Sequence, residues 1–246
     1  NDFKAINEII IDKDIVLIED NCESMGATLH GKLAGSFGTM GSFSCFFSHH
    51  ISTMEGGVVI TDDEELYHIM LALRAHGWTR NLPDKNMVSG LKSLNPFEES
   101  FNFVLPGYNL RPLEMSGALG SEQLNKLPKL ISGRRKNGSL VQDKLYGHPD
   151  LMIQKEIGAS SWFGFSLLIR PNSDRTREDL IKKLNQFGFE CRPIVTGNFT
   201  KNKVLKYFDY SIHGKLSNAE YIDRNGLFIG NHHYSLFDAI KKLEEI

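Results

Sequence analysis

The order of apolar and polar residues along the chain predicts a mixture of helices and strands. Apolar residues in the segment 3–10 recur at helical spacing. Residues 15–19 form an apolar run before Asp20, which is typical of a strand buried on both faces of a parallel sheet. Two β-prone runs, residues 43–47 and 58–60, enclose the polar segment Ser48-His49-His50. We therefore expect two strands that carry a histidine pair on the loop between them.

The rest of the chain predicts a helical middle and a second group of strands. Residues 61–64, Thr-Asp-Asp-Glu, form a capping box that opens a helix ended by Gly77. A long polar loop and a rigid turn at residues 106–112 come next. The later elements expected are helices at residues 113–133, 134–146, 176–187 and 236–246 and strands at residues 163–169 and 189–194. This order predicts an α/β fold, with one domain at residues 1–133 and a smaller α+β domain at residues 134–246.

The composition narrows the class of protein. A formal net charge of −2 gives no electrostatic case for nucleic acid, and no apolar run approaches the ~20 residues that a membrane span needs. The three cysteines are odd in number and far apart, which argues against a disulfide framework and favours a reducing, cytoplasmic setting. The chain begins without Met and inside a helical pattern, so we expect it to be the C-terminal part of something longer.

Two features have both a chemical and an ordinary interpretation. Asp20 follows the first strand, where open α/β sheets place ligands, but a solvated acid or a helix cap fits equally well. His49 and His50 fit a catalytic base, a metal ligand pair or surface residues. Adjacent residues of a strand point to opposite faces, so at most one histidine is expected to enter a given site. No acidic or cysteine partners occur nearby at metal-ligand spacing, so we expect no metal.

In combination, the motifs are more specific. The chain resembles the sugar aminotransferase family named after its DegT, DnrJ, EryC and StrS members through Asp20-x-x-Glu23, Gly41-Ser-Phe-Ser44, Ser48-His49, Met54-Glu-Gly-Gly-Val-Val-Ile-Thr61, Gly107-Tyr-Asn109-Leu-Arg111 and Gly120-x-x-Gln123-Leu. The resemblance covers essentially the whole chain. It implies a fold type I enzyme dependent on pyridoxal 5′-phosphate (PLP), with a mostly parallel central sheet.

The resemblance also implies roles for four residues. Asp20 pairs with the pyridine nitrogen of the cofactor, Glu23 stands where the family usually has a cofactor-side glutamine, and Ser44 contacts the phosphate. Asn109 reaches the cofactor phosphate of the partner subunit, which implies a homodimer with shared active sites.

One departure from the family pattern is informative. The family places the lysine that bonds to the cofactor where this chain has His49, and a histidine cannot form that bond. The change resembles the sugar 3-dehydratase branch, which implies removal of the C3 hydroxyl from a GDP-linked 4-keto-6-deoxyhexose. That reaction uses pyridoxamine 5′-phosphate (PMP), with L-glutamate as amino donor. An imidazole, whose ordinary pKa is about 6.5, suits proton transfer near neutral pH, so we expect His49 to be the catalytic base. His76 is expected to support it, and Glu190 and Arg192 to line the substrate pocket.

Three other functions stay open at this point. A CDP-sugar 3-dehydrase would carry the histidine but needs an iron–sulfur cluster, and no cysteine occurs between Trp78 and Asn109, where its cluster would fall. An ordinary nucleotide-sugar aminotransferase is disfavoured by His49. A non-catalytic protein of the same fold is disfavoured by Asp20, Ser44 and Asn109. The family's upstream phosphate-binding Gly-Ser-Thr and ring-stacking aromatic find no match, so we expect the chain alone to bind cofactor poorly.

Overall fold

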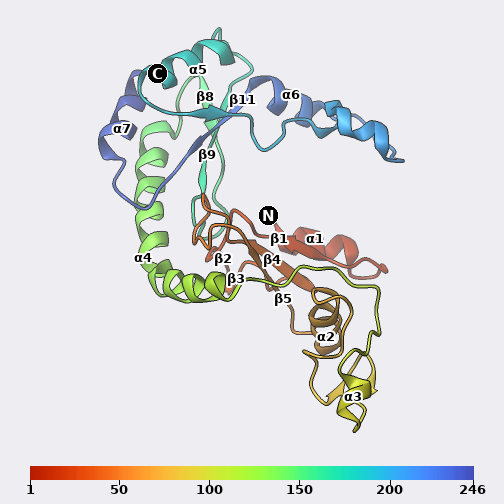
Figure 1. Ribbon diagram of the computed structural model, residues 1–246. Coiled ribbons are helices and arrows are strands. Elements are labelled where there is room, and N and C mark those ends of the chain that lie inside the picture. Colours follow the sequence, from red (N-terminus) through yellow and green to blue (C-terminus); the bar gives the residue numbers. More distant parts are fainter. The chain divides into compact units, whose positions relative to one another are not determined.

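The computed structural model describes all of residues 1–246 and contains both helices and strands, as the α/β class predicts (Figure 1). It divides into two units, the first of Asn1–Leu127 with Ile157–Ala159 and the second of Pro128–Glu156 with Ser160–Ile246. The assignment of residues 1–133 and 134–246 to the two domains of an enzyme stays a prediction. No helix combines the length and the apolar character that a membrane span requires.

The first helix, α1 (Phe3–Ile10), forms where the apolar spacing predicts it. Asp2 caps the helix, because its side chain accepts a hydrogen bond from the backbone N–H of Ala5 at 3.1 Å. The ring of Phe3 stacks on that of Phe37 with 4.4 Å between the centroids. This contact joins α1 to the glycine-rich segment that leads into the central sheet.

A three-stranded sheet in the order β1 (Ile18–Asp20), β4 (Met40–Ser44), β5 (Gly57–Ile60) forms the centre of the first unit. β1 and β4 are parallel, and β4 and β5 are antiparallel. The strand expected at residues 15–19 begins only at Ile18, because Ile18 is the first residue with a partner, Met40, on β4. β1 is an edge strand in which only Glu19 is buried, so the expected burial on both faces is wrong.

Short elements occupy the segments that the sequence pattern left irregular. They are the hairpin of β2 (Thr28–Leu29) and β3 (Lys32–Leu33), the hairpin of β6 (Lys85–Asn86) and β7 (Gly90–Leu91), and helix α3 (Pro96–Glu99). These two hairpins and the short helix are separate elements in the connections between the larger helices and strands.

Helix α2 (Glu64–Leu73) is present as predicted, but its cap differs and it ends at Leu73, before the expected Gly77. Asp63 accepts the capping hydrogen bond from the N–H of Leu66 at 2.9 Å. Thr61, the expected cap, accepts from the N–H of Asp63 at 3.1 Å and donates its hydroxyl to the carbonyl oxygen of Thr39 at 2.8 Å. The capping box is therefore wrong in its first residue.

Helix α4 (Glu114–Leu145) is one continuous helix of 32 residues, where the sequence pattern predicted two. The expected break at Gly133 does not occur, because this glycine lies inside the helix. A Cβ atom there would come within 1.9 Å of the carbonyl oxygen of His233, so Gly133 serves close packing. Pro128 also lies inside α4, at the border between the two units, and contributes no N–H to the helix.

The second unit is built on a four-stranded antiparallel sheet. Its order is β10 (Cys191–Arg192), β11 (Gly226–Gly230), β9 (Gly164–Ile169), β8 (Leu151–Ile153). Alternate apolar residues of β9 and β11 are buried in one core with apolar residues of α4, α5 (Arg177–Gln186) and α7 (Phe237–Lys241). The expected strand at residues 163–169 is confirmed as β9, whereas the strand expected at residues 189–194 contains only two residues.

The helices of the second unit are partly as expected. Thr176 caps α5 by accepting from the N–H of Asp179 at 3.2 Å, as predicted. The expected last helix is divided into α7 and a 3₁₀ turn, η3 (Lys242–Glu245). Three further elements were not predicted: η1 (Phe199–Lys201), η2 (Lys203–Tyr207) and α6 (Ser217–Asn225). α6 leads directly into β11, which was also missed.

Two buried asparagines fasten the loop after β11 to α4. Asn137 and Asn231 are 2% and 8% exposed. The amide nitrogen of Asn137 donates to the backbone oxygens of His232 and Tyr234 at 2.9 and 2.8 Å and to Asn231 Oδ1 at 3.1 Å. Its Oδ1 accepts from the N–H of Leu236 at 3.1 Å. The loop therefore depends on one side chain for four hydrogen bonds.

Candidate active site

The carboxyl ends of β1 and β4 carry the first predicted site residues. Because the strands are parallel and Asp20 lies opposite Ser42, Asp20 and Ser44 end neighbouring strands at one edge of the sheet. Asp20 is exposed, and its Oδ1 accepts a hydrogen bond from the backbone N–H of Cys22 at 3.1 Å. Ser44 is half-buried, and its hydroxyl oxygen accepts from the N–H of Phe46 at 3.2 Å. The structure thus brings a carboxylate and a hydroxyl together.

Cys22 and Glu23 follow Asp20 in a tight turn. The N–H of Ser24 closes the turn by donating to the carbonyl oxygen of the buried Asn21 at 3.1 Å. Burial, and then the neighbouring carboxylates of Asp20 and Glu23, raise the pKa of the Cys22 thiol to about 11. The thiol is therefore neutral near pH 7 and is not a nucleophile there. Glu23 is half-buried in the same turn.

Glu19 is a supporting residue that sequence reasoning missed. It is 4% exposed, and its carboxylate accepts hydrogen bonds from the backbone N–H groups of Gly35 and Gly38, both at 2.7 Å, and of Phe37. A buried carboxylate with several amide donors is a fixed anchor. It ties the glycine-rich segment to the residue directly before Asp20. The only sequence signal was an acid inside an apolar run, followed 16 to 19 residues later by glycines.

The predicted catalytic histidine lies in the turn between β4 and β5, so the expected loop between two strands is confirmed. β4 ends at Ser44, so residues 46–51 leave the sheet earlier than the apolar run predicts. The N–H of His49 donates to the carbonyl oxygen of Phe46 at 3.0 Å, and the two rings meet edge to face at 6.0 Å. The argument that His49 and His50 point to opposite faces assumed that both belong to a strand, and neither does. Their burial still differs, because His50 is 3% exposed and His49 is half-buried.

Backbone hydrogen bonds close the base of this turn. The N–H of Thr53 donates to the carbonyl oxygen of Cys45 at 2.9 Å. The N–H of Cys45 donates to the carbonyl oxygen of Gly56 at 3.0 Å. Met54 has a φ of +70° and Gly56 a φ of +134°, so the return to β5 uses two left-handed residues. The turn joins β4 to β5, and it therefore places His49 at the edge of the sheet that carries Asp20 and Ser44.

His76 and Asn109 are brought together where two chain segments cross closely. The N–H of His76 donates to the carbonyl oxygen of Tyr108 at 2.8 Å, and Ala75 pairs with Asn109. A Cβ atom on Gly77 would come within 1.7 Å of a backbone oxygen of the other segment, so only glycine fits the crossing. His76 itself has a φ of +64°. Such strained conformations are uncommon outside glycine and cluster at functional sites.

Glu190 and Arg192 belong to the second unit. Glu190 is exposed and directly precedes β10, which contains Cys191 and Arg192. The guanidinium carbon of Arg192 lies 4.5 Å from the ring centroid of Phe228 and 5.7 Å from that of Phe163. Arg192 is exposed, and its planar guanidinium can stack on aromatic rings in this way. Its place in a substrate pocket, like that of Glu190, stays a prediction.

Comparison with known proteins identifies relatives of the whole chain. The model of the DegT/DnrJ/EryC1/StrS aminotransferase family matches residues 1–241. The GDP-4-keto-6-deoxy-D-mannose 3-dehydratase of Escherichia coli O55:H7 is 63% identical over 247 residues, which cover 100% of this chain and 64% of that protein. The chain therefore spans 64% of the length of this relative.

Solved structures of the same enzyme superpose closely. The E. coli enzyme with bound hydrated PLP has a TM-score of 0.97 at 63% identity, and the match covers 100% of this chain and 63% of that one. Three other structures of GDP-4-keto-6-deoxymannose-3-dehydratase have TM-scores of 0.96 to 0.97 at 63% identity and cover 100% of this chain and 64 to 65% of theirs. One is a histidine-to-asparagine variant with bound GDP-perosamine, and one holds a trapped PLP–glutamate geminal diamine. In the third, a histidine is replaced by lysine and the serine directly before it by asparagine.

These matches confirm the fold expected from the motifs, that of the PLP-dependent aminotransferases. The family model covers nearly the full length of the chain, and the identity to the E. coli enzyme extends over all of it. The chain belongs to the DegT/DnrJ/EryC1/StrS aminotransferase family.

Proposed function

We propose that this protein is a PLP- and PMP-dependent GDP-4-keto-6-deoxy-D-mannose 3-dehydratase that takes its amino group from L-glutamate. The observation that carries the proposal is His49, on the closed turn beside Asp20 and Ser44, where the family places its cofactor-binding lysine. No lysine occurs between Lys32 and Lys85. An ordinary aminotransferase needs that lysine, so the site favours the dehydratase branch.

The donor set at the sheet edge fits PLP. Asp20 presents an exposed carboxylate at the end of a parallel strand, which suits a protonated pyridine nitrogen. Ser44, at the end of the adjacent strand, offers a hydroxyl to the phosphate. We assign Glu23 to the cofactor side of the same edge and Asn109 to the phosphate held by a partner subunit. When bound, the cofactor supplies an amine for the C4 ketone of the sugar and a ring that takes up electrons.

The chain's own residues then handle the proton. His49 takes the proton from the C4′ carbon of the cofactor as the C3 hydroxyl leaves the sugar. The two solved variants support this position: one of them alters a histidine together with the serine before it, and in this chain a serine directly precedes a histidine only at Ser48-His49. His76, held in its strained conformation by the crossing segments, is proposed to support the base.

The substrate and the amino donor follow from the relatives. The 63% identical enzyme is a GDP-4-keto-6-deoxy-D-mannose 3-dehydratase, and its structures hold GDP-perosamine and a PLP–glutamate adduct. Glu190 and Arg192 are assigned to the GDP-sugar pocket, where the stacked guanidinium of Arg192 suits an anionic diphosphate. The product would be a 3,6-dideoxy sugar nucleotide, as on a route to colitose for O-antigen and lipopolysaccharide.

We also propose a homodimer with shared active sites in the cytoplasm. The segment that carries Asn109 exposes large apolar side chains on both sides of it, and a second copy would cover them. They are Phe101 65%, Phe103 53%, Tyr108 63%, Leu110 67% and Leu113 66%. The three cysteines are free, which fits a reducing compartment.

The experiment that tests the function uses a chimaera in which residues 1–246 replace the matching part of the E. coli relative. Given GDP-4-keto-6-deoxymannose, PLP and glutamate, it is expected to form the 3-deoxy-4-keto sugar. Each turnover should convert one glutamate to one 2-oxoglutarate and one ammonia, since glutamate supplies both the nitrogen and the electron pair. Nuclear magnetic resonance of the sugar and enzymatic assays of the two other products check this. A 4-amino sugar as the main product would show an aminotransferase instead.

A second prediction concerns cofactor attachment. Because no lysine stands at the position of His49, the chimaera should hold PLP without a covalent bond to the protein. Borohydride reduction followed by peptide mass spectrometry should show no pyridoxyl-lysine. The E. coli relative is the matched control. A reduced lysine adduct found within residues 1–246 at cofactor stoichiometry would contradict the assignment of His49.

A further inference from the structure

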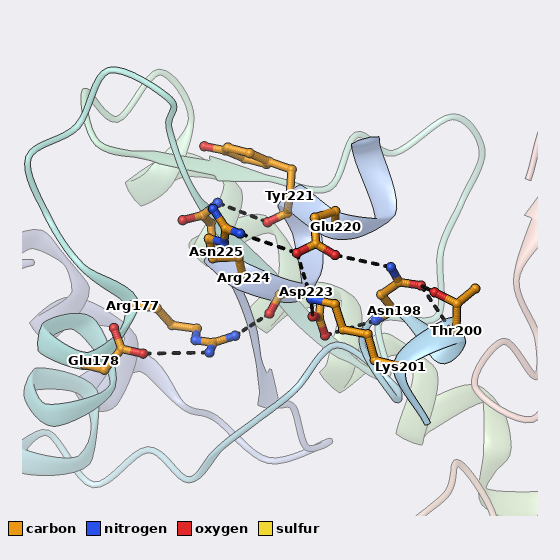
Figure 2. A network of polar contacts seen from close by, with 10 residues as sticks. All are labelled: Arg177, Glu178, Asn198, Thr200, Lys201, Glu220, Tyr221, Asp223, Arg224 and Asn225. Atoms are coloured by element: carbon orange, nitrogen blue, oxygen red, sulfur yellow. Dashed lines mark hydrogen bonds and ion pairs between the residues drawn. The ribbon is translucent and has the colours of Figure 1, made fainter. Parts of the chain in front are cut away.

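The second unit holds a polar network around Asp223 that none of the assignments above uses (Figure 2). We propose that Asp223 is a positioning residue for substrate binding, because it fixes residues 193–198, which continue the strand that carries Arg192. The inference rests on the proposed function, since it places Arg192 in the GDP-sugar pocket.

The segment after Arg192 has an unfavourable backbone shape. Val195 has a φ of +52° and Gly197 a φ of +68°. A left-handed φ is a genuine outlier for a β-branched residue such as valine. Val195 is 76% exposed, so packing of its side chain does not account for this conformation. Strain of this kind persists only where the surroundings impose it, and it clusters at functional sites.

Asp223, on α6, imposes the shape. Its Oδ1 accepts a hydrogen bond from the backbone N–H of Asn198 at 3.0 Å, and its Oδ2 accepts from Lys201 Nζ at 2.8 Å. The same Oδ1 lies 2.0 Å from the point that a Cβ atom on Gly197 would occupy. The carboxylate therefore binds the segment and also fills the space that the glycine leaves open. Figure 2 shows Asn198 and Lys201 converging on it.

The helix that carries Asp223 is itself fixed to the sheet. The hydroxyl of Tyr221 donates to the carbonyl oxygen of Ile169 on β9 at 2.6 Å, and Arg177 of α5 donates to the backbone oxygen of Asp223. α6 then continues into β11, which pairs with β10 and hence with Arg192. Asp223 binds the segment after β10, and α6 leads into β11, which pairs with β10. Both connections end at the strand that carries Arg192, so a shift of Asp223 is expected to displace Arg192.

A purely stabilising role fits the network less well. The side chains of Lys201, Glu220 and Asp223 are 51%, 38% and 25% exposed. Ion pairs this open to water contribute little to the free energy of unfolding. The groups nevertheless meet at one place. Lys201 Nζ donates to both Glu220 and Asp223, and the Asn198 side chain donates to Glu220 at 3.4 Å. The network therefore fixes a position more than it adds stability.

The first test compares Asp223→Asn with Glu178→Gln in the dehydratase assay. Glu178 belongs to the same network but reaches it through Arg177, at 3.7 Å. We expect Asp223→Asn to raise KM for GDP-4-keto-6-deoxymannose about tenfold, because Lys201 loses one of its two carboxylate partners and the segment relaxes. The value of kcat should stay within about twofold, since the reacting atoms are untouched. Glu178→Gln should change neither.

The second test uses two glycines that share a backbone conformation. Gly197 and Gly214 have φ values of +68° and +67°, but a Cβ atom on Gly214 would meet nothing within 4 Å. Alanine at either position would have to adopt nearly the same left-handed φ, and only Gly197→Ala also collides with Asp223. KM should therefore rise for Gly197→Ala and stay unchanged for Gly214→Ala.

Hydrogen–deuterium exchange of residues 193–198, measured on the full chain of 246 residues, gives a readout that does not need activity. We expect faster exchange of the Asn198 amide in Asp223→Asn and no change in Glu178→Gln. If the parent chimaera does not dehydrate the sugar, the proposed function fails, and faster exchange would still support the hold on this segment. Unchanged KM in Asp223→Asn, with or without a lower melting temperature or faster exchange, would overturn the positioning role.

Discussion

Replacing His49 with asparagine is expected to lower the rate of dehydration by about 10²- to 10⁴-fold in the chimaeric enzyme, the loss typical of a removed general base. Asparagine keeps a polar side chain in the turn, and the backbone bond from residue 49 to the carbonyl oxygen of Phe46 does not depend on the imidazole. Asp20 and Ser44 are unchanged, so binding of PMP should persist. The rate is measured by product formation at saturating sugar and glutamate, and PMP binding by titration.

His50→Asn is the neighbouring control for His49→Asn. His50 is 3% exposed, so its replacement is expected to affect the melting temperature more than the chemistry. Each variant should therefore be compared at equal folded fraction, determined by circular dichroism. Loss of dehydration in His50→Asn together with near-normal activity in His49→Asn would place the catalytic histidine one residue later than we propose.

Asn137→Ala is expected to lower the free energy of unfolding by about 4 kcal/mol. The substitution leaves the backbone oxygens of His232 and Tyr234 and the N–H of Leu236 without the side chain that pairs them, and each such group left unpaired costs about 1–3 kcal/mol. Asn231 Oδ1 loses one donor and keeps the N–H of His232 at 2.8 Å. Urea unfolding of residues 1–246, followed by tryptophan fluorescence, measures the change. Trp162 lies in the core of the same unit and reports its loss.

Asn172→Ala is the matched control for this prediction. Asn172 is exposed, so the same chemical change there should stay within about 0.5 kcal/mol. If Asn137→Ala lost less than about 1 kcal/mol, the loop after β11 would have another means of attachment, and the four hydrogen bonds of Asn137 would not be what holds it.

Local sequence signals located several elements correctly. The apolar spacing of α1 and the Thr176 cap of α5 involve residues within a few positions of one another, and both are confirmed. The strand-end position of Asp20 also holds, since it depends on one apolar run and its end. Errors began where a distant partner decides the outcome: Gly133 does not end a helix, because the carbonyl of His233 packs against it.

The site shows the same division. The motifs named Asp20, Ser44, His49, His76 and Asn109, and the structure brings the first three to one sheet edge and the last two to one crossing. The supporting residues were not visible in the sequence pattern. Glu19 acts on amides 16 to 19 residues away, and Asn137 acts on a residue 94 positions away. For Glu19 the sequence shows only an acid inside an apolar run with glycines downstream, which does not by itself predict these contacts.

The unbroken course of α4 has a consequence for engineering. Domain borders usually fall in exposed linkers, where proteases cut and foreign segments are tolerated. Here the border at Leu127 and Pro128 lies inside a helix, so an insertion would sever backbone hydrogen bonds instead of lengthening a tether. Ile157–Ala159 belongs to the first unit, so the chain also crosses the border more than once. The two units are therefore poor candidates for splitting into separately expressed halves or for exchange as cassettes between relatives.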